Sequence, residues 1–182
     1  MFGRTRFRRR HRRLLEKLKL EAENVHDVMF GSMDGMISTL AVISGVAGAT
    51  SNNFIVLVAG LSALLAEAIS MGFSSYMSDK LREGILATKK IRDSEKPLDE
   101  SVVILVATLV GGGVILLPFI LSINQALLWS VVFAGFLLFG MGAQFSKLAK
   151  RSALLGGIET MTFGMFAAAI TYMVGYAFAM LA

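Results

Sequence analysis

The sequence predicts an all-α polytopic membrane protein with five transmembrane helices, and two observations support this fold class. Hydrophobic residues make up 55% of the 182-residue chain and charged residues only 17%, whereas about 25% of residues are charged in an average globular domain. The apolar residues also fall in long runs, each close to or above the ~20 residues that a helix needs to cross a bilayer. The predicted spans are residues 28–50, 54–78, 101–122, 126–146 and 157–180.

The N-terminal segment, residues 1–27, is basic and precedes the first span. Its apolar residues recur at helical spacing among charged ones, at Leu14, Leu18, Ala22 and Val25. We therefore expect residues 12–27 to form an amphipathic helix that lies on the membrane surface and leads into the first span. A basic segment ahead of a hydrophobic span is more often a topology signal than a nucleic-acid-binding site, so we expect no nucleic-acid partner.

The positive charges predict the orientation of the chain in the membrane. All 18 Lys and Arg residues lie in three segments, at 1–27, 79–100 and 147–151, and the other two loops have no charged residue. Positive residues near span ends favour the cytoplasmic side, and five spans place all three segments on one side. We therefore expect a cytoplasmic N-terminus, a C-terminus outside, and a five-span domain over residues 28–182 with a cytoplasmic loop at 79–100.

The composition excludes several kinds of site. The chain has no Cys and only two His, and both His precede residue 28. Thiolate metal sites, iron–sulfur clusters and a Ser-His-Asp arrangement inside the membrane are therefore ruled out. We expect no cofactor, and an enzyme is the least expected function because no nucleophile is accompanied by an acid–base pair.

Three acidic residues stand apart from the basic segments and fall within predicted spans: Asp34, Glu67 and Glu159. A carboxylate at the centre of a bilayer costs about 2.5–3.5 kcal/mol on insertion scales. Such residues usually face a cavity or a partner helix and are functional candidates.

The helical rise places these candidates relative to one another. Asp34 is about 9 Å and Met71 about 10 Å from the cytoplasmic ends of adjacent antiparallel spans, so the two lie at similar heights. Glu67, one turn from Met71 on the same face, is about 16 Å deep, and Ser38 on the first span lies near that level. Two carboxylates and a thioether suit a borderline divalent cation such as Fe²⁺ or Mn²⁺, with Ser38 and Glu159 as auxiliary residues of the path.

Each candidate also has a structural interpretation. Met71 can be an apolar filler, since Met adapts to irregular gaps. Asp34 can cap a helix break before Gly35, and Glu67 can be a protonated carboxyl group that hydrogen-bonds between helices. Glu159 can compensate the helix dipole in the first turn of the last span.

The pattern of these residues resembles the vacuolar iron transporter family. Residues 27–39, DVMFGSMDGMIST, are similar to the D-x-x-F-G-x-x-D-G-x-x-x-T stretch that opens the first span of that family. Ser70-Met71 followed by Tyr76 and Ser78 resembles its second-span S-M-x-x-G-E-Y-x-S motif, and the resemblance extends over about 27–182. It implies a five-span homodimer with the metal path between the subunits, moving Fe²⁺ and sometimes Mn²⁺ out of the cytosol in exchange for protons. By motif position, Asp34 and Met71 would be the translocation residues.

The chain departs from this family in two places. Ser74-Ser75-Tyr76 replaces G-E-Y, so the motif glutamate is missing, and Glu67 is a candidate substitute. The 79–100 loop is short, as in family members that lack the cytosolic metal-binding domain. Because iron-specific members carry that domain, the short loop weakens the expectation that this chain is specific for iron.

The leading hypothesis is a homodimeric exporter of divalent metal driven by counter-transported protons. The alternatives are a membrane scaffold or assembly factor without transport, and an exporter of another small cation. The compact size and the absence of organelle-targeting features favour a prokaryotic plasma membrane.

Overall fold

The computed structural model describes residues 3–88 and 97–181, which form helices with no strand among them. The helices are α1 (Gly3–Ala49), α2 (Asn53–Thr88), α3 (Pro97–Ile120), α4 (Ala126–Leu148) and α5 (Ala153–Leu181). Each contains a stretch long and apolar enough to cross a membrane: Val25–Ala49, Asn53–Arg82, Glu100–Ile120, Ala126–Leu148 and Ala153–Leu181. The all-α fold with five candidate spans is therefore confirmed.

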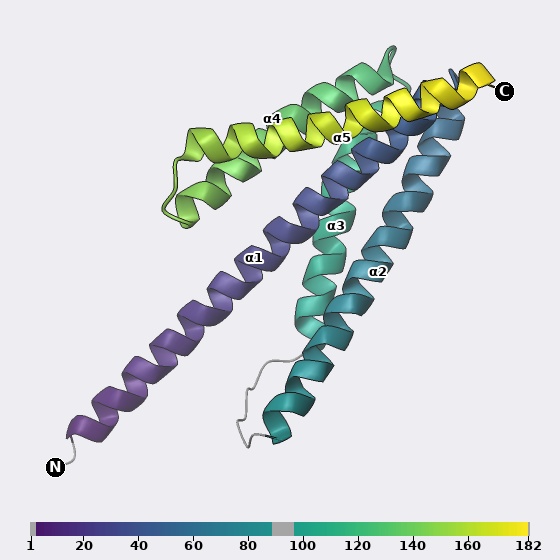
Figure 1. Cartoon of the computed structure of the whole chain (residues 1–182). Coiled ribbons are helices and arrows are strands. Elements are labelled where there is room, and N and C mark those ends of the chain that lie inside the picture. Colours follow the sequence, from purple (N-terminus) through teal and green to yellow (C-terminus); the bar gives the residue numbers. More distant parts are fainter. Residues whose placement is uncertain (1–2, 89–96, 182) are drawn as a thin grey trace.

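Helix α1 continues without a break from Gly3 into the first span (Figure 1). The sequence analysis placed residues 12–27 in a helix on the membrane surface, and the backbone of this segment is helical. A surface helix must bend before it crosses the bilayer, however, and no Gly or Pro lies between Gly3 and Gly31 to interrupt the hydrogen-bond ladder. The described backbone shows no such bend, and the position of residues 12–27 on the membrane surface stays a prediction.

The predicted loop at 79–100 is shorter than expected. Helix α2 extends to Thr88 and α3 begins at Pro97, so only residues 89–96 of that segment fall outside the described helices. Pro97 stands at the first position of α3, where its missing N–H group costs no helical hydrogen bond.

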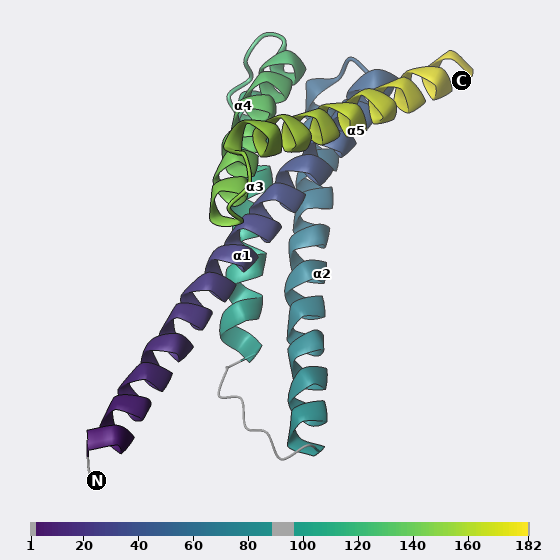
Figure 2. The ribbon, with the colours of Figure 1, turned by 60° about the vertical axis from the view of Figure 1, so that its left-hand side comes forward.

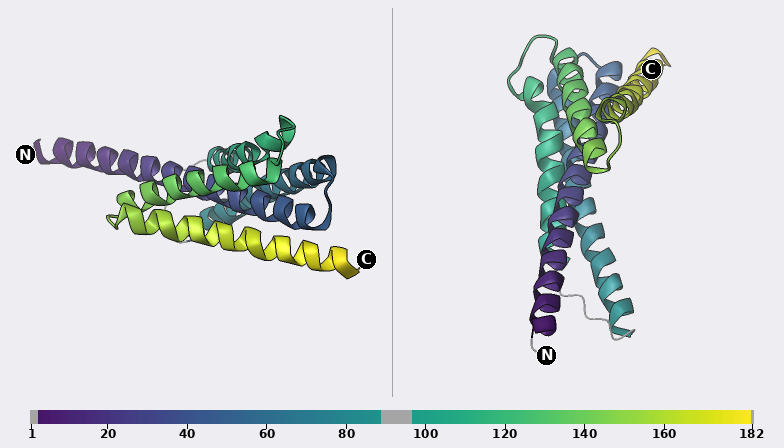
Figure 3. Two further views of the ribbon diagram at one scale, coloured as in Figure 1. Left: turned by 90° about the horizontal axis from the view of Figure 1, so that it is seen from above. Right: turned by 90° about the vertical axis from the view of Figure 1, so that its left-hand side faces the viewer.

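Helix α1 is the centre of the fold and contacts each of the other helices, while α2 pairs with α3 and α4 pairs with α5. Figure 1 shows the α4–α5 hairpin crossing the upper half of α1, and Figure 2 shows α1 passing in front of α3 and beside α2. The two ends of the chain lie at opposite ends of the molecule (Figure 3), as an odd number of spans requires.

The buried core lies where α1 meets the other helices. Large side chains that are fully enclosed there include Leu40, Ile43, Ile115, Leu116 and Leu138. By contrast, burial on α5 is confined to Gly156, Gly157, Gly164 and Ala168. Most of the α5 surface is therefore apolar and uncovered, as expected for a helix that faces lipid or a second copy of the chain.

Small residues let α1 and α3 approach closely, as the glycine spacing in the first span predicts. A Cβ atom built on Gly35 would lie 2.4 Å from the carbonyl oxygen of Thr108. A Cβ atom on Gly111 would likewise lie 2.3 Å from the carbonyl oxygen of Ser32. The backbones are thus in direct contact, which fixes the height of Asp34 relative to α3.

Candidate functional site

Residues 27–39 of α1 present different faces to different helices. Gly31 and Gly35, four residues apart, touch the backbone of α3. Asp34 and Ser38, also four residues apart, face α2 instead: Asp34 lines a cavity with α2 residues, and Ser38 bonds to Glu67. The helical period therefore separates a packing face from a polar face within one short segment.

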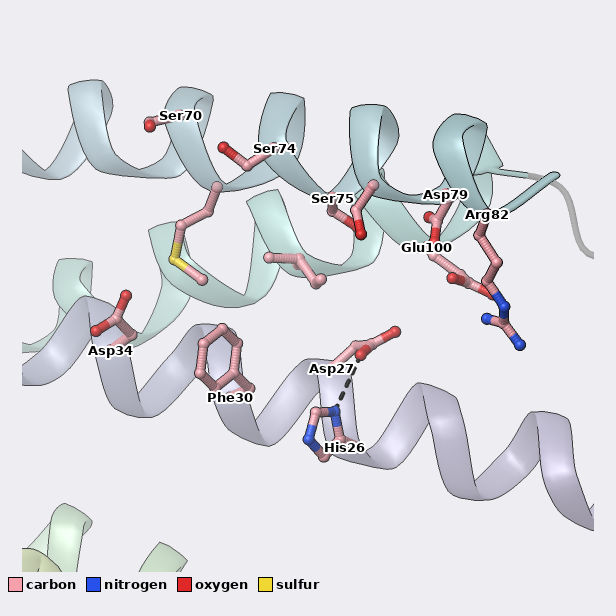
Figure 4. Close-up of a pocket in the computed structure, with 13 residues that line it drawn as sticks. His26, Asp27, Phe30, Asp34, Ser70, Ser74, Ser75, Asp79, Arg82 and Glu100 are labelled. Carbon is pink, nitrogen blue, oxygen red and sulfur yellow. Dashed lines mark hydrogen bonds and ion pairs between the residues drawn. The ribbon is translucent and has the colours of Figure 1, made fainter. Parts of the chain in front are cut away.

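The polar face borders a cavity of about 730 Å³ that α1, α2 and α3 enclose. Asp34 and Met71 line its deep end, and Asp79, Arg82 and Glu100 line it where the helices leave the apolar spans. Figure 4 shows Asp27 and Asp34 pointing from α1 toward α2, and Ser75 pointing from α2 toward α1.

The α2 wall of this cavity consists largely of hydroxyl groups. Ser70, Ser74 and Ser78 recur every four residues, and Ser75 lies beside them. A serine ladder offers donors and acceptors to water along the whole depth of the cavity but no negative charge. The negative charge at the deep end therefore comes from α1.

The structure brings Met71 to the deep end of the cavity beside Asp34 and reveals a third group there. Thr108 of α3 is fully buried, and its hydroxyl oxygen lies 2.9 Å from the Ile104 carbonyl oxygen and 3.6 Å from the Met71 sulfur. Its single proton can be donated to either of these two acceptors. Sequence reasoning missed Thr108, whose only signal was a polar residue four positions before Gly112 in an apolar span. Its hydroxyl restricts where the thioether can lie.

Glu67 lies half-buried beyond the cavity lining, where it is held by the polar face of α1. The Ser38 hydroxyl bonds to the Glu67 carboxyl group and also lies 2.8 Å from the Asp34 carbonyl oxygen. Through this one hydroxyl group, Ser38 links the Glu67 carboxyl group to the backbone of α1 at Asp34.

The structure does not support Glu67 as a replacement for the missing motif glutamate. Ser75, which occupies the motif position, is eight residues from Glu67, or about 12 Å along α2. Ser75 lines the cavity and Glu67 does not. Glu67 adds a carboxyl group two turns deeper instead of restoring one at the cavity wall.

Glu159 does not join the other candidates. Its side chain is exposed on α5, and it lines neither of the cavities formed beside α1. The explanation by the helix dipole also fails, because α5 begins at Ala153 and Glu159 lies in its second turn.

Within the described residues, no three His, Asp or Glu side chains come together in a group that could hold a metal ion. Of the predicted donors, Asp34 and Met71 line one cavity, and Glu67 is held to the same helix through Ser38. Carboxylates and a thioether together suit a borderline divalent ion, whereas Mg²⁺ or Ca²⁺ sites use oxygen ligands alone.

Comparison with known proteins places these residues in a family context. The vacuolar iron transporter of Plasmodium falciparum (isolate 3D7) is 37% identical over 78 residues, which cover 43% of this chain and 29% of that protein. Vacuolar iron transporter 1 of Arabidopsis thaliana is 36% identical over 81 residues, or 44% of this chain and 32% of that protein. The vacuolar iron transporter of Toxoplasma gondii (strain ATCC 50861 / VEG) is 38% identical over 72 residues, which cover 40% of this chain and 24% of that protein. The aligned part of this chain thus spans about a third or less of the length of these relatives.

The family model extends much further along the chain than these pairwise matches. It covers residues 25–92 and 79–176, which include Asp34, Glu67, Met71 and every apolar span in whole or in large part. The chain belongs to the VIT family.

Proposed function

We propose that this protein exports a divalent metal ion, Fe²⁺ or Mn²⁺, from the cytosol in exchange for protons. The observation that carries the proposal is that Asp34 and Met71 line the same polar cavity, while Glu67 bonds to Ser38 one turn further along α1. Membership of the VIT family and the names of the relatives support metal as the cargo. The mixed oxygen and sulfur donors favour a borderline ion over a hard one.

The cavity mouth adjoins the basic segments, which favours a cytoplasmic opening. Arg82 and Glu100 line the mouth, and both belong to the segment at 79–100 that holds a third of the positive charges. By the positive-inside rule this end faces the cytosol, with the N-terminus inside and the C-terminus outside. We place the protein in a prokaryotic plasma membrane.

Ser38 couples the protonation of Glu67 to the backbone at Asp34. A serine hydroxyl has a single proton, so Ser38 cannot donate to the Asp34 carbonyl oxygen and to Glu67 at once. When Glu67 is protonated, it donates to Ser38, and Ser38 donates to the carbonyl oxygen. When Glu67 is ionised, Ser38 turns its proton to the carboxylate. Metal binding favours the ionised form, because a metal ion must displace the proton of its ligand.

A homodimer would complete the metal site. Among residues 3–88 and 97–181 of one chain, no three carboxylate or imidazole groups gather to hold an ion. A two-fold axis near α1 would double the set of Asp34, Glu67 and Met71. The uncovered apolar surface of α5 provides area for such an assembly. The metal path then lies between the subunits.

Proteoliposomes test this function directly. Uptake of Fe²⁺, Mn²⁺, Co²⁺ and Zn²⁺ is measured across an imposed pH gradient for the wild type, Asp34→Asn, Glu67→Gln and Met71→Leu. We expect Asp34→Asn to abolish most of the flux and Glu67→Gln to remove its dependence on the pH gradient. Met71→Leu should shift the preference toward the harder Mn²⁺, because it removes the sulfur donor without changing the volume much.

Glu159→Gln is the matched carboxyl control, since Glu159 lies away from the cavity, and it should transport like the wild type. Wild-type flux in Asp34→Asn and Glu67→Gln would refute the mechanism. A wild-type protein that moves none of the metals would favour the scaffold hypothesis. Flux of another small cation, unaffected by competition from these four metals, would favour the hypothesis that the protein exports that cation instead.

A further inference from the structure

A second cavity lies between α1 and α4. It has a volume of about 250 Å³ and is closed on the α4 side by Phe145. Asp34 lines this cavity as well as the first, whereas Met71 lines only the first. The second cavity therefore shares Asp34, His26 and Phe30 with the first cavity, and it adds Met29 and Met33, which line the second cavity alone.

The second cavity has three soft or borderline donors on one face of α1: His26, which lines both cavities, and Met29 and Met33. Their spacing of three and then four residues makes each a neighbour of the next, with about 5–6 Å between adjacent Cβ atoms. Met29 is 8% exposed, and Met33 is half-buried deeper in the span. The donors thus lead from the outer end of the span inward to Asp34.

His26 is arranged as metal-binding histidines commonly are. Its Nδ1 atom lies 3.2 Å from Oδ1 of Asp27 (Figure 4). In the tautomer with a proton on Nδ1, this contact is an N–H donating to the carboxylate, and Nε2 is left with a free lone pair. A carboxylate partner of this kind orients the ring and raises its strength as a ligand. The side chain is also 64% exposed, so an ion can reach it from water.

We propose that this second cavity binds a soft monovalent cation of the Cu⁺ or Ag⁺ class. Thioether and imidazole donors select such ions over Mn²⁺ or Mg²⁺. The ion would lie between His26 and Met29, or one turn further in between Met29 and Met33, where Asp34 balances its charge. This site goes beyond the proposed function, because neither Glu67 nor Met71 lines it and its ligands suit a different class of ion.

Methionine also fills apolar cavities without binding anything. What distinguishes this cavity from the first is the pair of thioethers, Met29 and Met33, between the imidazole of His26 and the carboxylate of Asp34, which line both cavities.

Calorimetric titration of the full-length protein in detergent with Ag⁺, a redox-stable probe, tests the proposal. The variants are His26→Ala, Met33→Leu, Met71→Leu and Met173→Leu, the last on the exposed surface of α5. Leu conserves the volume of Met, and helicity by circular dichroism checks that each variant is folded. We expect His26→Ala and Met33→Leu to weaken Ag⁺ binding about tenfold or more. Met71→Leu and Met173→Leu should bind Ag⁺ like the wild type, and excess Mn²⁺ should not displace it.

Equal affinity in Met33→Leu and Met173→Leu would overturn the site, as would unchanged binding in His26→Ala. Ag⁺ affinity that falls to the same extent in every Met variant would also overturn it, since it would indicate binding to any accessible thioether. The outcome is separable from that of the transport assay. A protein without Fe²⁺ or Mn²⁺ flux that still loses Ag⁺ affinity in Met33→Leu would disprove the proposed function and retain this site.

Discussion

The contact between α1 and α3 at Gly35 is so close that a single methyl group should disturb it. In Gly35→Ala, the added Cβ would lie 2.4 Å from the Thr108 carbonyl oxygen and 3.1 Å from the Thr108 C and Cα atoms. Carbon and oxygen atoms in ordinary contact are about 3.3–3.6 Å apart, so the overlap is about 1 Å. Both groups belong to backbones and cannot rotate away. The two helices must therefore move apart.

The expected loss of stability follows from two opposing effects. Overpacking of this kind typically costs about 1–3 kcal/mol, while replacing Gly by Ala inside a helix contributes about 1 kcal/mol in the opposite direction. Gly113→Ala is the matched control, because Gly113 lies inside α3 and its Cβ would meet nothing within 4 Å. The gain in stability from the higher helix propensity of Ala is the same in both variants. Gly35→Ala should therefore be less stable than Gly113→Ala by about 1–3 kcal/mol.

Unfolding of both variants by sodium dodecyl sulfate in detergent micelles, followed by circular dichroism, measures this difference. Metal uptake in proteoliposomes provides a second measurement, since a shift of α1 moves Asp34 away from Met71 and should lower uptake in Gly35→Ala alone. Equal stability and equal uptake in the two variants would refute the inference that the helix backbones touch at Gly35.

Two further changes test single hydrogen bonds. Thr108→Val removes the hydroxyl that bonds to Met71 at 3.6 Å and should raise the KM for metal uptake while costing only about 0.5–1.5 kcal/mol of stability. Thr108→Ser should restore the KM, and an unchanged KM in Thr108→Val would remove Thr108 from the site. Asn52→Ala removes the cap of α2, where Oδ1 accepts from the Phe54 and Ile55 N–H groups at 3.0 and 3.4 Å. Asn52→Ala should lower the free energy of unfolding, measured by thermal unfolding, by about 1 kcal/mol. If it lowers this free energy no more than Asn53→Ala does, the cap is not needed.

The spans and the relative heights of the candidate residues could be predicted because helix geometry depends little on context. A rise of about 1.5 Å per residue and antiparallel neighbours are enough to place Asp34 beside Met71 and Ser38 beside Glu67. The structure shows both pairs together. These pairs involve only α1 and α2, which are consecutive and joined by a short turn.

What could not be predicted depends on how helices distant in sequence pair. Thr108 bonds to Met71 because α3 packs between α1 and α2, and hydropathy does not reveal that arrangement. Glu159 was expected to be an auxiliary residue of the path because it falls in an apolar run, yet its side chain is exposed on α5. The extension of α2 to Thr88, beyond its predicted end at residue 78, was missed for a different reason. Local hydrogen bonds continue a helix after its hydrophobic stretch has ended.

The close spacing of functional groups on α1 has a mechanical consequence for the site. A helix is stiff over the few turns from residue 26 to residue 39, so its faces move together. The α3 contact at Gly35 sets the position of the helix, and Asp34, the adjacent residue, lines both cavities. A change of protonation at Glu67 acts on this same segment through Ser38. Any motion of α1 that opens one cavity at Asp34 must therefore alter the other, so ion binding on the two sides of α1 should be coupled.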